Sequence, residues 1–132
     1  MTPKETVRAY VEAFNAADWD RMGELFTPDA EILGVLGSAP IADALAIWRE
    51  LHTNMTERLE IADLVEEGPQ VVARLVERGR FVGPFRGMPG AAPTGKAYAI
   101  GAMEWFQFRD GRICRRWGAR DSAAIVRQVR TR

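Results

Sequence analysis

The stretch "KAYAIGAMEWFQFRDGRICRRWGARD", residues 96–121, shows the clearest structural pattern in the chain. Its first half alternates between two faces, as the side chains of a β-strand do. One face holds Tyr98, Ile100, Ala102, Glu104, Phe106 and Phe108, and the other holds Ala99, Met103, Trp105 and Gln107. The sequence "RDGR", residues 109–112, is typical of a hairpin turn. The stretch therefore predicts two long antiparallel strands whose inner face is apolar except for Glu104.

Other segments predict further strands of the same sheet. "LEIADLVEEG" (59–68) and "QVVARLVERGRFV" (70–82) have strand composition and end at glycine-containing turns. "EILGVL" (31–36) predicts a short strand after "TPDA" (27–30), which should end the helix before it. Residues 83–95 contain three prolines and four glycines, so we expect a long loop beside the sheet.

Helices are predicted mainly in the first half of the chain. "TPKE" at residues 2–5 has the form of a capping box, Asp18 can cap a second helix, and Pro40 can open a third. The third has an apolar stripe of Ile41, Leu45, Trp48, His52 and Met55. A last helix should run from Ser122 to about Arg130. We expect one α+β domain over residues 1–132, with helices on one face of a curved, largely antiparallel sheet and an apolar pocket between them.

The composition limits the kinds of partner. Of 132 residues, 47% are hydrophobic, and 18 basic residues balance 18 acidic ones. This balance argues against a dedicated nucleic-acid binder, and we expect most of the C-terminal arginines to lie on solvated faces. Cys114 is the only cysteine, so neither an intrachain disulfide nor a cysteine metal cluster can form. The sequence has no apolar signal segment and no run long enough to span a membrane, so we expect a cytoplasmic protein.

Glu104 is an acid at a position where the pattern predicts interior. Burial disfavours the charged form of a carboxyl group, so we expect the pKa of Glu104 to rise. Glu104 would then act as a protonated hydrogen-bond donor or as a second acid in the pocket. Two alternatives remain: a bulge turns Glu104 to solvent, or an arginine such as Arg74 or Arg116 pairs with it.

Asp121 follows the second strand of the hairpin. If this strand has no bulge, Asp121 lies near the rim of the pocket, on one face with Ile113, Arg115, Trp117 and Ala119. A carboxylate there suits general acid–base catalysis if apolar neighbours bring its pKa closer to neutrality. The alternative is that Asp121 only caps the last helix.

His52 is the only histidine, and the helical pattern places it on the inner stripe of the third helix. There it can hydrogen-bond a substrate or one of the acids, or it can be a satisfied histidine of the core. The candidate walls and substrate contacts of the pocket are Tyr10, Phe14, Trp48, Phe85, Met88, Trp105, Phe106 and Trp117. Of these, Tyr10 and Phe14 can equally be core residues.

The chain resembles a known family over nearly its whole length. The segment "VRAYVEAFNAADWDRMGELFTPDAEI" (7–32), "PTGK" (93–96), "DGRI" (110–113) and the spacing from Trp117 to Asp121 are similar to those of SnoaL-like polyketide cyclases of the NTF2-like superfamily. The first segment is shared widely among NTF2-like proteins, and the other three are more specific.

The resemblance implies a fold, a reaction and site residues. The family fold is a cone of curved antiparallel sheet, closed by N-terminal helices around an apolar cavity, and it is usually dimeric. Members that close anthracycline rings carry out an intramolecular aldol condensation without metal or cofactor, with an aspartate at the position of Asp121. Glu104 and Tyr10 match positions that bind the substrate oxygen in ketosteroid isomerases. Gly34 stands where those isomerases have their base, which argues against that activity.

The sequence departs from the family pattern in three places. Phe81 replaces a common pocket histidine, "GMPGAAPTGK" (87–96) is longer than the usual "GIPPTGK", and "MTERLE" (55–60) replaces a segment with "FPD". We predict a cofactor-independent cyclase or isomerase acting on an apolar polycyclic or polyketide-like ketone, as a homodimer. The alternatives are an epoxide hydrolase-like or hydroxylation-assisting enzyme on the same fold, and a non-catalytic ligand-binding or dimerisation module.

Overall fold

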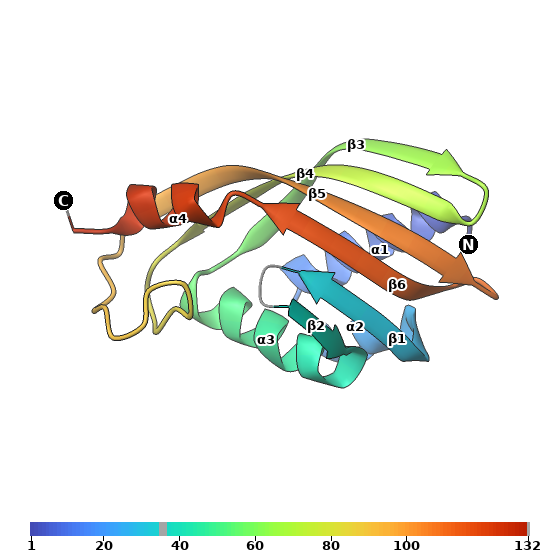
Figure 1. The fold of residues 1–132 in the computed structure, drawn as a ribbon, viewed down its shortest axis with the longest axis horizontal. Coiled ribbons are helices and arrows are strands. Elements are labelled where there is room, and N and C mark those ends of the chain that lie inside the picture. The colour runs from blue at the N-terminus through green and yellow to red at the C-terminus, as the bar shows by residue number, and fades with distance from the viewer. Residues whose placement is uncertain (35–36, 132) are drawn as a thin grey trace.

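A computed structural model describes residues 1–34 and 37–131, and its centre is one six-stranded sheet (Figure 1). The strands follow the order β2-β1-β6-β5-β4-β3, and β1 pairs with β6 in parallel while all other neighbours are antiparallel. Their bounds are β1 Phe26–Gly34, β2 Gly37–Pro40, β3 Arg58–Glu67, β4 Gln70–Arg80, β5 Ala97–Arg109 and β6 Arg112–Arg120. The predicted α+β architecture with a largely antiparallel sheet is confirmed, although the parallel pair β1–β6 makes the sheet mixed.

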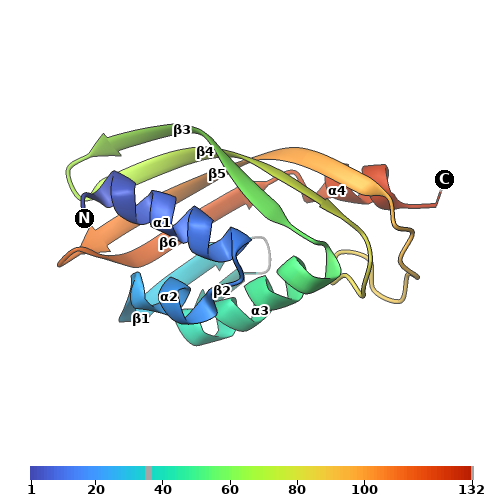
Figure 2. The ribbon, with the colours of Figure 1, turned by 180° about the vertical axis from the view of Figure 1, so that it is seen from behind.

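Four helices accompany the sheet in the described residues. They are α1 Pro3–Asn15, α2 Trp19–Glu24, α3 Ile41–Asn54 and α4 Ser122–Val129. Figure 2 shows α1, α2 and α3 on one face of the sheet, whereas α4 lies at its far end beside the 83–95 loop. The predicted capping box is present, with the Thr2 side chain accepting from Glu5 N–H and the Glu5 carboxylate accepting from Thr2 N–H. Asp18 caps α2 and Pro40 precedes α3, as predicted.

The hairpin between β5 and β6 forms where the sequence predicts it. Asp110 and Gly111 have φ angles of 52° and 80°, the left-handed conformation that a two-residue hairpin turn requires. Glycine adopts this conformation without strain, and aspartate tolerates it better than most residues. Along β5 the six predicted inner residues are all buried, including Glu104 at 2% exposure.

A bulge in β6 reverses the predicted faces of that strand. Gln107 pairs with Arg115, but Phe108 pairs with Ile113, so Cys114 is an extra residue on the β6 side. After the bulge, Arg116, Gly118 and Arg120 lie opposite the inner β5 residues. The shared face expected in a strand without a bulge, with Ile113, Arg115, Trp117, Ala119 and Asp121 together, is therefore not formed, and of these residues only Ile113 is buried.

Two smaller differences concern the segment before α3. The sequence "TPDA" (27–30) does not end the helix but forms part of β1, because Leu25 already closes α2. The short strand β2 has no strand-like pattern in the sequence and was not predicted. The last two residues of the predicted strand "EILGVL", residues 35 and 36, lie outside the described part of the chain.

The outer face of the sheet exposes large apolar side chains. Met103, Trp105 and Trp117 are 53%, 47% and 37% exposed, and Trp105 lies directly opposite Trp117 in the β5–β6 pairing. Among residues 1–34 and 37–131, no helix is long and apolar enough to cross a membrane.

Candidate active site

A cavity of about 290 Å³ lies between the inner face of the sheet and the helices. Its apolar lining comes mainly from α1, α3, Met55 and the 83–95 loop, and includes Tyr10, Phe14, Ala44, Ile47, Trp48, Leu51, Met55, Leu59 and Phe85. Its ionisable lining comes from the sheet and from the segment after α3, and comprises Glu57, Glu77, Tyr98, Glu104, Arg116 and Arg120, with Arg86 at the loop. The cavity thus combines an apolar volume with a buried cluster of charged and phenolic groups.

Glu104 accepts three hydrogen bonds inside this cluster. Tyr10 OH donates to Oε1 at 2.9 Å, while Arg116 Nη1 and Arg120 Nη2 donate to Oε2 at 3.0 and 2.8 Å. Of the alternatives left open by the sequence, pairing with Arg116 is the one that the structure contains. The side chain is an acceptor here, so the expectation of a protonated donor is wrong.

The pKa of Glu104 is set by burial and by the two arginines in opposite directions. Burial alone would raise it, but the Arg116 and Arg120 guanidinium groups and the hydrogen bond from Tyr10 bring it below the ordinary value. The predicted rise is therefore wrong, because bulged β6 brings two cations to this carboxylate. Burial and the neighbouring Glu104 charge raise the pKa of Tyr10, so its hydroxyl stays protonated.

Arg120 joins Glu104 to a second buried acid, Glu77 of β4. Its Nε lies 2.8 and 3.0 Å from the two Glu77 oxygens, and its Nη2 lies 2.5 Å from Oε1 of Glu77 and 2.8 Å from Oε2 of Glu104. Burial would lower the pKa of Arg120, but Glu104 and Glu77 outweigh this, so Arg120 stays charged.

Gly118 makes room for this arrangement. A Cβ atom built on Gly118 would lie 2.0 Å from Nη1 of Arg116 and 3.2 Å from Nη1 of Arg120. Because Gly118 is the β6 residue directly opposite Glu104, any side chain there would displace the guanidinium groups from the carboxylate. This position requires glycine for space and not for its backbone angle.

Arg116 also offers a hydrogen-bond donor that the cluster does not use. Its guanidinium carbon lies 5.3 Å from the Trp48 ring centroid, and the side chain is only 4% exposed. Within the described residues, its Nε–H has no hydrogen-bond partner. A buried donor of this kind is costly unless a ligand or water satisfies it, and Arg116 lines the cavity.

The third buried acid, Glu57, lies between α3 and β3. It is 7% exposed, and Tyr98 OH donates to its Oε1 at 3.3 Å. Burial, and then the charge of Glu77, raise the pKa of Glu57 to about 8. Burial likewise raises the pKa of Glu77, although Arg120 opposes this.

The structure brings about half of the predicted site residues to the cavity. Tyr10, Phe14, Trp48, Phe85 and Glu104 line it. Met88 packs against the smaller apolar cluster near α4, and Phe106 is fully buried with its ring centroid 5.0 Å from that of Tyr10. Trp105 and Trp117 lie on the outer face of the sheet, so neither contacts the cavity.

Asp121 caps α4. Its carboxylate accepts from Ala124 N–H at 3.0 Å, its side chain is 60% exposed, and Arg127 lies 3.8 Å away. It is not among the residues that line the cavity, although its neighbours Arg120 and Ser122 are. The structure therefore contains the helix cap that the sequence offered as the alternative role of Asp121. A catalytic role for Asp121 stays a prediction.

His52 lies on the side of α3 that faces α1 and α2. Its ring contacts Phe14 and Trp19 at centroid distances of 5.7 and 5.8 Å, and Nε2 lies 3.4 Å from the carbonyl oxygen of Asn15. Among the described residues, the α3 side chains that reach the cavity are Ala44, Ile47, Trp48 and Leu51. A substrate contact by His52 also stays a prediction.

The sequence reasoning missed Glu57, Glu77, Tyr98, Arg116 and Arg120 as site residues. A pattern in β4 could have revealed Glu77, because Val71, Ala73, Leu75 and Glu77 alternate inward just as the β5 residues up to Glu104 do. The two arginines could not be placed without knowledge of the bulge. In the described chain, no group of three or more His, Cys, Asp or Glu side chains is arranged to hold a metal ion.

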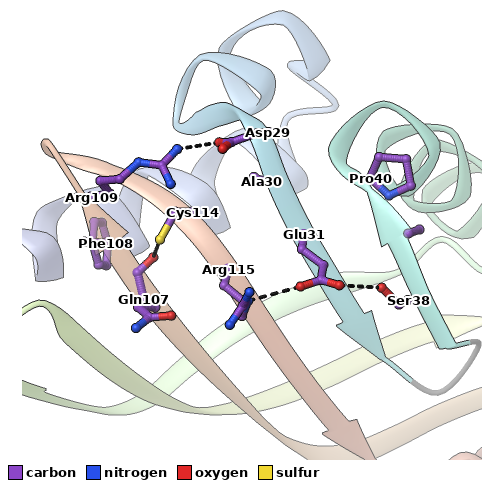
Figure 3. Close-up of a pocket in the computed structure, with 11 residues that line it drawn as sticks. Asp29, Ala30, Glu31, Ser38, Pro40, Gln107, Phe108, Arg109, Cys114 and Arg115 are labelled. Atoms are coloured by element: carbon purple, nitrogen blue, oxygen red, sulfur yellow. Dashed lines mark hydrogen bonds and ion pairs between the residues drawn. The ribbon is translucent and has the colours of Figure 1, made fainter.

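A second hollow of about 660 Å³ lies on the outer side of β1 and β6 (Figure 3). Its charged groups are exposed and paired with one another, Arg109 with Asp29 and Arg115 with Glu31, which also accepts from Ser38. Water screens the charges of these exposed ion pairs, and each charged side chain is already paired with one of opposite charge. We therefore place the candidate site in the smaller, inner cavity.

A curved sheet closed by helices around an apolar cavity with buried ionisable groups defines a class of small cavity enzymes. A model of the SnoaL-like polyketide cyclase family matches residues 4–129, and the chain belongs to this family. The aklanonic acid methyl ester cyclase AcmA of Streptomyces galilaeus is 32% identical, with 81% of this chain and 76% of that protein covered. The nogalonic acid methyl ester cyclase of Streptomyces nogalater is also 32% identical, with 78% of each covered.

A solved structure shows the same fold. The crystal structure of wild-type IdmH from Streptomyces antibioticus has a TM-score of 0.84 and 27% identity, and the match covers 97% of this chain and 98% of that one. The predictions of the family, the NTF2-like fold and an enzyme of the cyclase class in polyketide metabolism are confirmed.

Proposed function

We propose that this protein catalyses an intramolecular aldol cyclisation of an apolar, polycyclic, polyketide-derived ketone. This reaction removes a proton from the carbon next to one carbonyl group and joins that carbon to a second carbonyl carbon of the same molecule. The second carbonyl oxygen then takes up the proton. Two relatives act by name on aklanonic acid and nogalonic acid methyl esters, which favours a methyl ester of similar type as the substrate.

The observation that carries this proposal is the buried charged cluster beside an apolar volume. Apolar walls from Phe14, Trp48 and Phe85 would hold the substrate folded, so that its two reacting carbons lie close together. The Nε–H of Arg116, which has no hydrogen-bond partner within the described residues, would be a fixed donor for the oxygen on which negative charge develops. Glu104, which Arg120 also binds, holds this guanidinium group in place, so little reorganisation would be needed during the reaction.

The family resemblance implies that Asp121 is the acid–base. Its place beside Ser122, which lines the α4 end of the cavity, would let it reach a substrate that extends to that end. His52 would act indirectly, through its contact with Phe14 in the cavity wall. Both roles remain proposals to be tested by substitution.

We also propose a cytoplasmic homodimer whose only ligands are small molecules. The apolar side chains of Met103, Trp105 and Trp117 form an exposed patch on the outer face of the sheet, and a second copy would cover it. The single cysteine, Cys114, is a free thiol, which suits a reducing compartment. The balanced net charge favours no polyanionic partner.

The experiment is to incubate the purified protein with aklanonic acid methyl ester and nogalonic acid methyl ester and to analyse the products by chromatography and mass spectrometry. A cyclase gives a product of unchanged mass with one more ring. A product heavier by one water would support the hydrolase-like alternative and refute cyclisation. The absence of any product, together with tight binding of the ketone, would instead favour a ligand-binding module.

A further inference from the structure

Glu57 is held in a fixed position on the cavity wall. The segment before it is attached to β4, because Arg80 N–H donates to the Met55 carbonyl oxygen and to Thr56 Oγ1, both at 2.9 Å. The Glu57 side chain is 7% exposed and lines the cavity. It is therefore a carboxyl group that a substrate in the cavity can touch and that bulk water barely reaches.

The cluster contains more acids than cations. Glu57, Glu77 and Glu104 are all buried, whereas two arginines neutralise them, because the third arginine of the lining, Arg86, is paired with Glu50. Arg116 is paired with Glu104, and Arg120 is divided between Glu104 and Glu77. Within the described chain, no arginine or lysine forms an ion pair with Glu57, whose hydrogen bond comes from Tyr98.

This imbalance means that one carboxyl group of the three retains a proton near neutral pH. Glu57 is that group, because it is the one without a cation. Burial, and then the charges of Glu77 and Glu104, raise the pKa of Glu57 to about 8. Arg120 and the hydrogen bond from Tyr98 oppose this rise without cancelling it. A carboxyl group that titrates close to the working pH is well suited to both accept and return a proton.

We propose that Glu57 performs the proton transfer that the family resemblance assigns to Asp121, and that Tyr98 positions Glu57. The inference rests on the proposed cyclisation. Ionised Glu57 takes the proton from the carbon next to the first carbonyl group, and the electron pair of the broken C–H bond forms an enolate. The enolate carbon attacks the second carbonyl carbon, the electron pair of that C=O bond moves to oxygen, and the resulting alkoxide takes the proton back from Glu57.

The test compares Glu57→Gln with Glu60→Gln and with Asp121→Asn. Glu60 is an exposed acid three residues along the chain, so its glutamine variant controls for the change of charge. We expect Glu57→Gln to lose about a hundredfold or more in turnover and Glu60→Gln to retain it. If Asp121→Asn loses turnover while Glu57→Gln does not, the proton transfer belongs to Asp121 and the proposal is overturned.

Two further readouts separate a catalytic role from a structural one. In the wild type, kcat/KM should rise with pH to a plateau, with a midpoint near 8, because the ionised form of Glu57 is the base. Tyr98→Phe removes a hydrogen bond that favours the ionised carboxylate, so it should move this midpoint upward. An unchanged midpoint in Tyr98→Phe would refute the positioning role.

Proton exchange in heavy water and titration of the free protein test the role of Glu57 separately from the proposed cyclisation. In heavy water, an enzyme that only removes and returns the proton would introduce deuterium next to the ketone without closing a ring. That result would refute cyclisation but support Glu57, provided that Glu57→Gln abolishes the exchange. Carbon-13 titration of the free protein requires no substrate: a Glu57 carboxyl group that ionises below about pH 6 would overturn the inference whatever the substrate proves to be.

Discussion

Replacing Glu57 by glutamine should stabilise the folded protein strongly at alkaline pH and have a much smaller effect at pH 5. Glutamine is close to glutamate in size, stays neutral at every pH, and its side-chain oxygen can still accept the hydrogen bond from Tyr98. The substitution therefore removes one property of Glu57, its tendency to ionise inside the cavity.

The size of the effect follows from the pKa of Glu57 in the two states. In the unfolded chain the carboxyl group has its ordinary pKa of 4.5, and burial raises the folded value to about 8. Between these two pH values the folded protein binds a proton that the unfolded chain has lost, so stability falls as pH rises. At about 1.4 kcal/mol per pKa unit, the full difference amounts to at most ~5 kcal/mol above pH 8.

Urea unfolding followed by tryptophan fluorescence at pH 5, 7 and 8.5 measures this effect. Relative to the wild type, Glu57→Gln should gain stability progressively across this range, and the remaining pH dependence should come largely from Glu77, whose pKa is also raised by burial. Glu60→Gln should behave like the wild type because its side chain is 66% exposed. A stability difference of less than about 1.4 kcal/mol between Glu57→Gln and the wild type at pH 8.5 would place the folded pKa within one unit of its ordinary value and refute the reasoning.

Substitutions at three other positions test the cluster, the cap and the outer face. Arg120→Met should lower the free energy of unfolding at pH 7 by about 3–5 kcal/mol, because it leaves two buried carboxylates short of a cation. The loss should shrink towards pH 5 in urea melts as those carboxylates take up protons, and a loss that is constant with pH would contradict the assignment. Asp121→Ala should lower the free energy of unfolding by about 1 kcal/mol through loss of the α4 cap. Asp121→Asn should keep the cap and the stability, so a fall in the turnover of this variant would show that the carboxylate takes part in the reaction. Trp105→Glu should convert the proposed dimer to a monomer in light scattering, and a wild type that is monomeric at all concentrations would exclude the dimer.

The sequence by itself was sufficient for most of the fold, because the deciding features are local. The capping box at Thr2, the Asp18 cap and the turn at Asp110 each depend on interactions within a few residues. The strict alternation along β5 also placed Glu104 on the inner face, since side chains of a regular strand change face at every residue.

The tertiary structure decided which charged groups surround that acid. One extra residue at Cys114 inverts the remainder of β6, so Arg116 and Arg120 turn inward while Trp117 turns outward. An alternating pattern cannot reveal such a bulge, because moving a strand by one residue exchanges its two faces without changing its composition.

The electrostatics of the cavity depend on residues far apart in the chain. Arg120 binds Glu77 across 43 positions, and Tyr98 reaches Glu57 across 41. Sequence alone predicted that burial would raise the pKa of Glu104, but the two arginines reverse that effect, and the raised pKa belongs instead to Glu57. Burial acts on each carboxyl group alike, so the protonation of each is decided by which cations the folded chain brings within a few ångströms of it.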